Sequence, residues 1–414
     1  MIEINRPIRI ISIIVLIVVL SLAFFSSYDA LKIDNLAFVI AIAIDEGTNS
    51  DNLEISFQIA KPASMSESSS EKGSTSTINS VEASSIGSAI TLMNSYVEKQ
   101  LNFSHCKLIV FSEAVAAKGI SEEIFTLMNN VQIRPSTNVV ISKTDAKYYI
   151  ENSSTNLEIL PTTYYEFFPT SSKYTGYVGN STLGDFFNSL NSTTAEPSAI
   201  LGGTIYSNVN DIKYYVPKNP QDYGNMKSNE SAISGERISE NLGLAVFKDE
   251  RLVGELNCFE TACFSIIENR VDSFLITIND PQNNEKYIDL VLYINQSPHK
   301  KVKVINNTPY ILLNCEFEGR VYSAKREENY LNEDSLKEIS NAASKYIELQ
   351  MYNYLYKTSK KFKSDINGFG KYARSQFLTT QEFNNYNWPE NYQNSFFKVN
   401  CNVSIKSGYL ITET

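Results

Sequence analysis

The chain has 414 residues, of which 43% are hydrophobic and 20% are charged, and its formal net charge is -10 at pH 7. This composition is typical of a globular protein that is large enough for about two or three domains, and it excludes a disordered chain. The acidic balance disfavours nucleic acid as a partner, because phosphate binding requires clustered Lys and Arg side chains.

The first residues have the layout of a secretory leader. Arg6 and Arg9 precede an uninterrupted apolar run, Ile10–Phe25, and a cationic flank of this kind stays on the cytoplasmic side. As a helix, the run of about sixteen residues spans roughly 24 Å, at the short end for a bilayer core of about 30 Å. The run ends in two phenylalanines where a cleavage site requires small residues. We therefore expect residues 1–28 to form an uncleaved signal-anchor helix, with the rest of the chain outside the cytoplasm.

Residues 29–200 are predicted to form an N-terminal α+β domain, because apolar strand-like runs alternate with amphipathic segments. Strands are expected at Leu36–Ile44, Leu53–Ile59, Leu108–Phe111 and Val139–Ile141, and helices are expected at Ile86–Leu101, from Ser121 onward and at Leu183–Leu190. Residues 63–80 are rich in Ser, Thr and Glu, and this composition predicts a mobile loop. Pro197 and the pair Gly202 and Gly203 predict a boundary after this domain.

Residues 201–268 are predicted to be a small middle domain. Gly243–Phe247 and Leu252–Leu256 flank Lys248–Arg251, a pattern that indicates a β-hairpin with a four-residue turn. A helix is expected at Glu260–Ile267.

Residues 269–414 are predicted to be a C-terminal α+β domain. Strands are expected at 274–278, 287–294, 300–305, 310–317 and 397–405, with a turn at Asn306 and Asn307. The strict alternation over 397–405 indicates one buried and one solvated face. A long helix, 335–367, is predicted to begin with a capping box of Ser335 and Glu338 and to end before Gly368. Its apolar stripe favours packing on a sheet over docking to a partner. The predicted fold class is therefore α+β, with three mixed domains and antiparallel or mixed sheets.

No cluster in the sequence predicts a catalytic, cofactor or metal site. The cysteines are scattered and odd in number, which indicates small buried side chains and leaves one distant bridge open as an alternative: Cys106, Cys258, Cys263, Cys315 and Cys401. The two histidines, His105 and His299, lie about two hundred residues apart. His105 adjoins Ser104 and Cys106, but adjacent strand residues point to opposite faces. No cofactor is expected.

Two weaker patterns leave other functions open. Paired acids, Glu122–Glu123 and Glu327–Glu328, have the residue types that glycoside hydrolysis uses, although such pairs usually belong to solvated faces. A tyrosine-rich segment contains four side chains that are candidates for an aromatic ligand cleft: Tyr164, Tyr165, Tyr174 and Tyr177. His105 is a further candidate contact.

Several short motifs, taken in their order and spacing, carry a more specific signal. They are Asp34–Val39, Leu101–His105 before Lys107–Val110, Gly243–Asp249 with Leu252–Gly254, Asp365–Gly370, and Asn387–Trp388. Over nearly the whole chain, this order resembles the Ger(x)C family, the C subunits of nutrient germinant receptors in endospore-forming bacteria. The family is usually lipidated on a Cys followed by Trp-Asp, whereas this chain has Ser27-Tyr28-Asp29. A serine cannot carry the thioether-linked lipid, so the resemblance implies anchoring by the helix instead.

The resemblance implies a non-catalytic subunit of a spore germinant receptor, which works with membrane-embedded A and B subunits in assembly and germination signalling. It places the chain at the spore inner membrane, with most of it on the outer face. An extracytoplasmic solute-binding protein that captures a germinant directly is the alternative, and a cell-wall hydrolase is a third.

Overall fold

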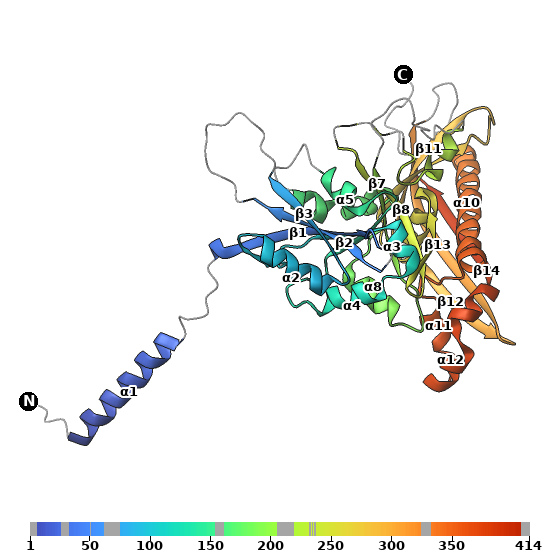
Figure 1. Ribbon diagram of the computed structural model, residues 1–414. Coiled ribbons are helices and arrows are strands. Elements are labelled where there is room, and N and C mark those ends of the chain that lie inside the picture. Colours follow the sequence, from blue (N-terminus) through green and yellow to red (C-terminus); the bar gives the residue numbers. More distant parts are fainter. Residues whose placement is uncertain are drawn as a thin grey trace, which may run out of the picture.

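The computed structural model describes residues 6–25, 33–49, 51–61, 75–153, 161–204, 219–231, 233, 235, 237–323 and 333–406. Its body contains two β-sheets that lie next to each other, with helices packed on both (Figure 1). The chain passes from the first sheet to the second after residue 256.

The first sheet has nine strands in the order β3-β2-β1-β5-β6-β7-β8-β9, with β4 paired to β1. These strands are β1 Leu36–Glu46, β2 Leu53–Ala60, β3 Ser76–Ala83, β4 Gln100–Asn102, β5 Leu108–Ser112, β6 Asn138–Ser142, β7 Ser198–Thr204, β8 Ser239–Lys248 and β9 Arg251–Leu256. The central strands β1, β5, β6 and β7 are parallel, and antiparallel pairs flank them. The sheet is therefore mixed.

Helices cover both faces of the first sheet, which explains its continuous apolar runs. On one face lie α2 Ile86–Tyr96, α3 Glu113–Lys118, α4 Ser121–Asn129 and α8 Leu183–Leu190; on the other lie α5 Ala146–Glu151 and α6 Pro161–Phe167, followed by a 3-10 turn Phe168–Ser171 and α7 Ser172–Thr175. Along β1, Ile42 and Ile44 enter the first of these cores, whereas Ala41 and Ala43 enter the second.

Part of the predicted Ser-rich loop is in fact strand β3. Its backbone pairs with β2 over the whole of Ser76–Ala83, and residues 63–74 lie outside the described part. The Ser56 and Ser80 hydroxyls lie 2.8 Å apart, and the Gln58 amide donates to Ser76 Oγ at 3.0 Å. A polar composition predicts little apolar burial, but composition alone does not reveal these hydrogen bonds between neighbouring strands.

Three further boundaries in this region differ from the prediction. Helix α2 ends at Tyr96 because Val97 is extended, and Leu101 belongs to β4. Gly202 and Gly203, which mark a predicted boundary, lie inside the buried strand β7. The hairpin between β8 and β9 has a two-residue turn, in which Asp249 takes a left-handed conformation with φ of 54°.

Residues of the predicted middle domain are shared between the two sheets. Strands β7, β8 and β9 belong to the first sheet. Helix α9, Cys258–Ile267, instead enters the core of the second sheet, together with Leu244 and Val246 of β8. In the described residues, 201–268 therefore have no sheet of their own.

The second sheet has five strands, and all of its pairs are antiparallel except the parallel pair β13–β14. They are β10 Ser273–Asn279, β11 Tyr287–Ile294, β12 His299–Ile305, β13 Thr308–Ser323 and β14 Phe396–Ile405. The alternation predicted for 397–405 is confirmed, since burial alternates along all of β14. The predicted turn is confirmed by the left-handed Asn306 and Asn307, with φ of 49° and 62°.

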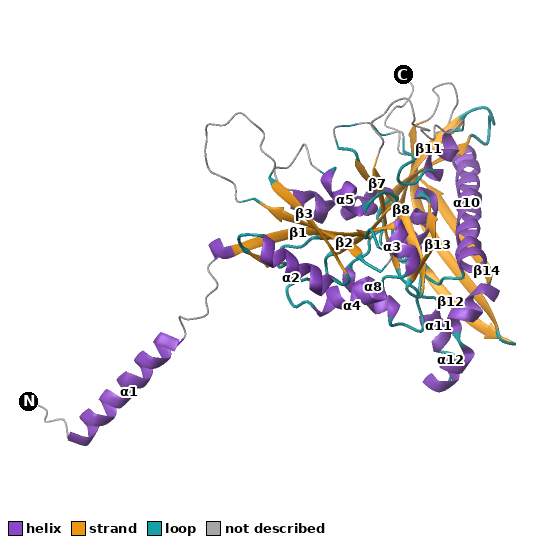
Figure 2. Ribbon diagram, in the orientation of Figure 1, coloured by secondary structure: helices purple, strands orange, loops and turns teal. Residues whose placement is uncertain are grey.

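The long helix α10, Glu333–Tyr356, packs along the second sheet beside β14, as predicted (Figure 2). It continues as one π-helical segment, Lys357–Phe362, and ends because Lys363 adopts φ of 54°. The predicted end before Gly368 is therefore about five residues too late. The predicted capping box is also wrong, because the helix begins at Glu333 and the Ser335 hydroxyl instead accepts from the Gln282 amide at 2.6 Å.

Short elements complete the body. They are the 3-10 turns Ile33–Asn35, Pro220–Asn225 and Tyr392–Asn394 and the helices α11 Gly370–Arg374, α12 Thr380–Tyr386 and α13 Trp388–Asn391.

The predicted leader is helical as α1, Arg6–Phe25, which Figure 1 shows apart from the body. Within the described part of the chain, no helix reaches the combination of length and apolarity that a membrane crossing requires. Several α1 side chains, as well as Ser27, lie outside the described residues.

Candidate functional site

The four tyrosines proposed for an aromatic cleft do not line one cavity. Tyr165 is fully buried and its hydroxyl donates to Gln58 Oε1 at 2.8 Å. Tyr174 is 67% exposed. Tyr177 lines a different cavity, of about 320 Å³, near Phe259.

Tyr164 belongs to a buried polar network. The Tyr149 hydroxyl donates to Asn241 Oδ1 at 2.8 Å, and the Asn241 amide donates to the Tyr164 hydroxyl at 2.9 Å. Arg237 lies 4.2 Å from the centre of the Tyr164 ring. Burial raises the pKa of both tyrosines, so these phenols stay neutral and their hydrogen bonds serve the core.

His105 and its neighbours do not form a nucleophile–base pair. His105 is exposed, with its ring 4.9 Å from the Phe38 ring in an edge-on contact. Cys106 is buried, and its thiol points to the Leu108 carbonyl at 3.6 Å. Burial raises the pKa of the Cys106 thiol to about 12, which keeps the thiolate scarce near neutral pH.

The paired acids do not meet in a cavity within the described residues. Glu122 and Glu123 lie in the first turn of α4, where negative charge favours the helix dipole. The second pair, Glu327–Glu328, lies outside the described residues. In the same described part, no group of three or more His, Cys, Asp or Glu side chains has the arrangement of a metal site.

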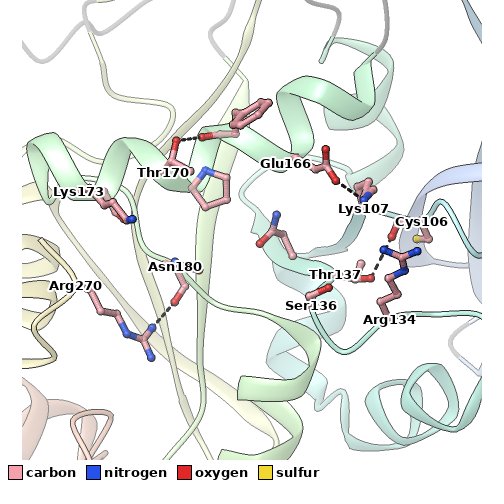
Figure 3. A pocket seen from close by; sticks show the side chains of 14 residues that line it. Cys106, Lys107, Arg134, Ser136, Thr137, Glu166, Thr170, Lys173, Asn180 and Arg270 are labelled. Atoms are coloured by element: carbon pink, nitrogen blue, oxygen red, sulfur yellow. Dashed lines mark hydrogen bonds and ion pairs between the residues drawn. The ribbon is translucent and has the colours of Figure 1, made fainter.

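A cavity of about 480 Å³ lies where the two parts of the body meet, and cations dominate its charged lining (Figure 3). Its charged residues are Lys107, Arg134, Glu166, Lys173 and Arg270. The Lys107 ammonium pairs with the Glu166 carboxylate. The Arg270 guanidinium donates to the Asn180 carbonyl at 2.6 Å. This arrangement suits an anionic ligand, because guanidinium and ammonium groups bind carboxylates and phosphates.

Sequence reasoning missed this cavity. Its four cations come from the residue before β5, the turn after α4, helix α7 and the turn after α9. Successive members of this set are roughly 30 to 100 residues apart in the sequence, so no local motif indicates that they share a site. The net negative charge of the whole chain also gives no indication of a local cluster of positive side chains.

Two of the sequence motifs that resemble the Ger(x)C family, Asp365–Gly370 and Asn387–Trp388, meet in a buried cluster. The Trp388 indole N–H donates to Asp365 Oδ2 at 2.8 Å, and the Gly370 N–H donates to the same oxygen at 2.9 Å. Burial raises the pKa of the Asp365 carboxyl group to about 6, although the hydrogen bonds from Gly370 and Trp388 act to lower it. The Asp365 carbonyl accepts from the Glu196 N–H at 3.0 Å, which links the segment to the first sheet. Through these hydrogen bonds, Asp365 connects the C-terminal part of the fold to the first sheet.

Two family models match the chain. The spore germination protein N-terminal domain matches residues 29–201, and the spore germination B3/GerAC-like C-terminal domain matches residues 242–408. The chain therefore belongs to the Ger(x)C family, the C subunits of germinant receptors, as the motifs predicted.

One solved structure supports the fold. The crystal structure of the GerBC protein matches with a TM-score of 0.51 and 14% sequence identity, over 88% of this chain and 96% of that one. At this identity, the match establishes a shared mixed α+β fold. A search of curated proteins found no match.

Proposed function

We propose that this chain is the non-catalytic C subunit of a spore nutrient germinant receptor, and that it supports receptor assembly and germination signalling beside the membrane-embedded A and B subunits. One observation carries the scaffold role: the two family segments are packed into a continuous body. Strands β8 and β9 belong to the second segment but complete the sheet of the first. A sheet to which both segments contribute strands resists relative motion of its parts, which suits a rigid support.

We place the body on the outer face of the spore inner membrane, anchored by α1. Among its described side chains, those from Ile10 at 59% to Val19 at 56% are exposed, and all of them except Ser12 are apolar. A helix that is apolar all round favours a bilayer or another apolar environment. Arg6 and Arg9 favour a cytoplasmic N-terminus. Because Ser27 stands at the position of the family's lipidated cysteine, the helix replaces the lipid.

Co-purification from spore membranes tests the assembly role. The tagged full-length chain is expected to retain the A and B subunits, and spores that lack it are expected to lose their response to nutrient, followed as the fall in optical density. The exposed Lys337→Gln variant serves as the control and is expected to behave as wild type. A chain that purifies alone, from spores that germinate normally without it, would contradict the proposal.

Intact mass and membrane partition test the anchor. The wild-type chain is expected in the membrane fraction with an unprocessed N-terminus, and Ser27→Cys tests whether a lipid can be gained there. A soluble, cleaved wild-type product would contradict the anchor and favour a secreted binding protein or hydrolase. That result would leave the family assignment unchanged.

A further inference from the structure

The cationic cavity has a charge opposite to that of the chain as a whole. Four of its lining residues are Lys or Arg and one is an acid, whereas the chain has a formal net charge of -10. Glu166 is engaged by Lys107. Among the described residues, Arg134, Lys173 and Arg270 have no carboxylate partner. An acidic protein that concentrates unpaired cations around one cavity attracts anions there.

The cations form two groups at opposite ends of the cavity, and Figure 3 shows this separation. At one end, Lys173 and Arg270 are held close because the Asp272 N–H donates to the Lys173 carbonyl at 2.9 Å. At the other end, the Thr137 N–H donates to the Arg134 carbonyl at 3.0 Å, and the Thr137 hydroxyl donates to the Cys106 carbonyl at 3.1 Å, next to Lys107.

Each end therefore offers one guanidinium and one ammonium group. A guanidinium presents paired N–H donors that match the two oxygens of a carboxylate. At the Arg134 end, the Lys107 ammonium already pairs with Glu166, so Arg134 is the main contact available to a ligand. The uncharged lining includes polar Asn180, whose carbonyl accepts from Arg270, and apolar Pro169 and Phe167, the last of which is 61% exposed.

We propose that this cavity binds a small organic anion with two carboxylates, one at each cationic end. Its volume of about 480 Å³ lies in the range of small-molecule sites, about 300–1,000 Å³. Pro169 and Phe167 offer apolar surface to a short carbon chain, and the rest of the uncharged lining is mostly polar. The ligand contacts both family segments, since Arg270 belongs to the second and the other cations belong to the first. The proposal does not depend on the receptor role.

Isothermal titration calorimetry on the full-length chain in a nonionic detergent tests this proposal. The probes are malonate, succinate, glutarate and adipate, with butyrate as a monocarboxylate of comparable length. At least one dicarboxylate is expected to bind roughly tenfold or more tightly than butyrate, because it gains a second charge-assisted contact. Its affinity is expected to fall as salt is added.

Two exposed cations, one from each end, provide the variants. Arg134→Gln and Lys173→Gln remove charges with no side-chain hydrogen bond in the described residues, so the fold is expected to persist. Each is expected to weaken the best dicarboxylate roughly tenfold and to leave butyrate less affected. Lys337→Gln, on the distant helix α10, is the matched control and is expected to change nothing.

Three results would overturn the proposal. The first is equal weak binding of butyrate and every dicarboxylate, and the second is an equal effect of all three substitutions. The third is binding of only an acidic peptide, with no dicarboxylate bound, which would make the cavity a protein-docking surface. None of these results bears on membrane anchoring or on co-purification with the A and B subunits.

Discussion

The Ser344 hydroxyl of α10 accepts a hydrogen bond from the Val403 backbone N–H of β14, with 3.0 Å between the two heavy atoms. Three more α10 side chains do the same along the strand: Ser340 for Ile405, Glu348 for Cys401 and Tyr352 for Val399. Four residues of a helix advance about 6.0 Å and two residues of a strand about 6.6 Å. Because these two advances are nearly equal, every fourth helical side chain lies beside every second N–H of the strand. The outer edge of β14 is thereby closed to pairing with another chain.

Replacing Ser344 by Ala is expected to lower the free energy of unfolding by about 1–2 kcal/mol, because the Val403 N–H loses its acceptor in a partly buried place. The higher helix propensity of Ala offsets about 0.5 kcal/mol of this loss. Urea unfolding measures the effect. Lys345→Ala, on the exposed side of the same turn, is the control and is expected within about 0.5 kcal/mol of wild type. Equal losses in both variants would contradict the edge-capping role.

Local patterns predicted most of the fold because the apolar runs are unambiguous. The run Leu36–Ile44 and the alternation along 397–405 could be assigned to strands from side-chain spacing alone. Spacing does not reveal which strands pair. The parallel β13–β14 pair and the membership of β8 and β9 in the first sheet depend on contacts between distant segments.

The candidate site shows the same limit more strongly. A ligand cleft is predicted at Tyr164 and Tyr165 because these side chains are aromatic. Their hydroxyl groups instead form hydrogen bonds inside the protein, with Asn241 and Gln58. The cations of the cavity, such as Arg134 and Arg270, are brought together only by tertiary packing. Sequence distance hides such a site.

Glu196 is expected to make stability fall as pH rises from about 4.5 to about 7. Its carboxylate accepts from the Asp249 N–H at 2.8 Å, but burial, and the nearby Asp249 and Asp365, raise its pKa from 4.5 to about 7. In this window the folded state holds a proton that the unfolded state has released, so the slope of unfolding free energy against pH is negative.

Glu196→Gln keeps the hydrogen-bond acceptor and removes the titration. The loss of stability between pH 5 and pH 8 is expected to shrink by on the order of 2 kcal/mol. Urea unfolding at both pH values measures the change, and the exposed Glu316→Gln is the control. An unchanged pH dependence in Glu196→Gln would show that the carboxyl already ionises normally in the folded state.

Gly370 is expected to tolerate no side chain. A Cβ there would lie 2.6 Å from the Thr194 carbonyl oxygen and 2.7 Å from Trp388 Cδ1. Gly370→Ala therefore forces the Asp365–Trp388 cluster away from the first sheet, and we expect a loss of roughly 1–3 kcal/mol in unfolding free energy. Thermal and urea unfolding measure it. Gly235→Ala, where a Cβ meets nothing within 4 Å, is the control, and a comparable loss there would contradict the steric explanation.

The five cysteines are expected to be reduced and unreactive in the folded protein. All five are free and buried. Burial raises the pKa of the Cys106 thiol to about 12 and also raises the pKa of the Cys258 and Cys263 thiols. A contact with Cys315, its partner across β13 and β14, raises the pKa of the Cys401 thiol, and burial adds to this. Few thiolates are therefore available to an aromatic disulfide reagent.

Thiol counting with such a reagent measures this directly. The folded chain is expected to react slowly at all positions, and the chain in guanidinium chloride without reductant is expected to yield five thiols. Lys337→Cys supplies an exposed thiol that must react at once in the folded protein, which proves that the reagent is active. A count of three after unfolding would instead reveal a disulfide, and Cys315–Cys401 is the pair that the strand register brings together.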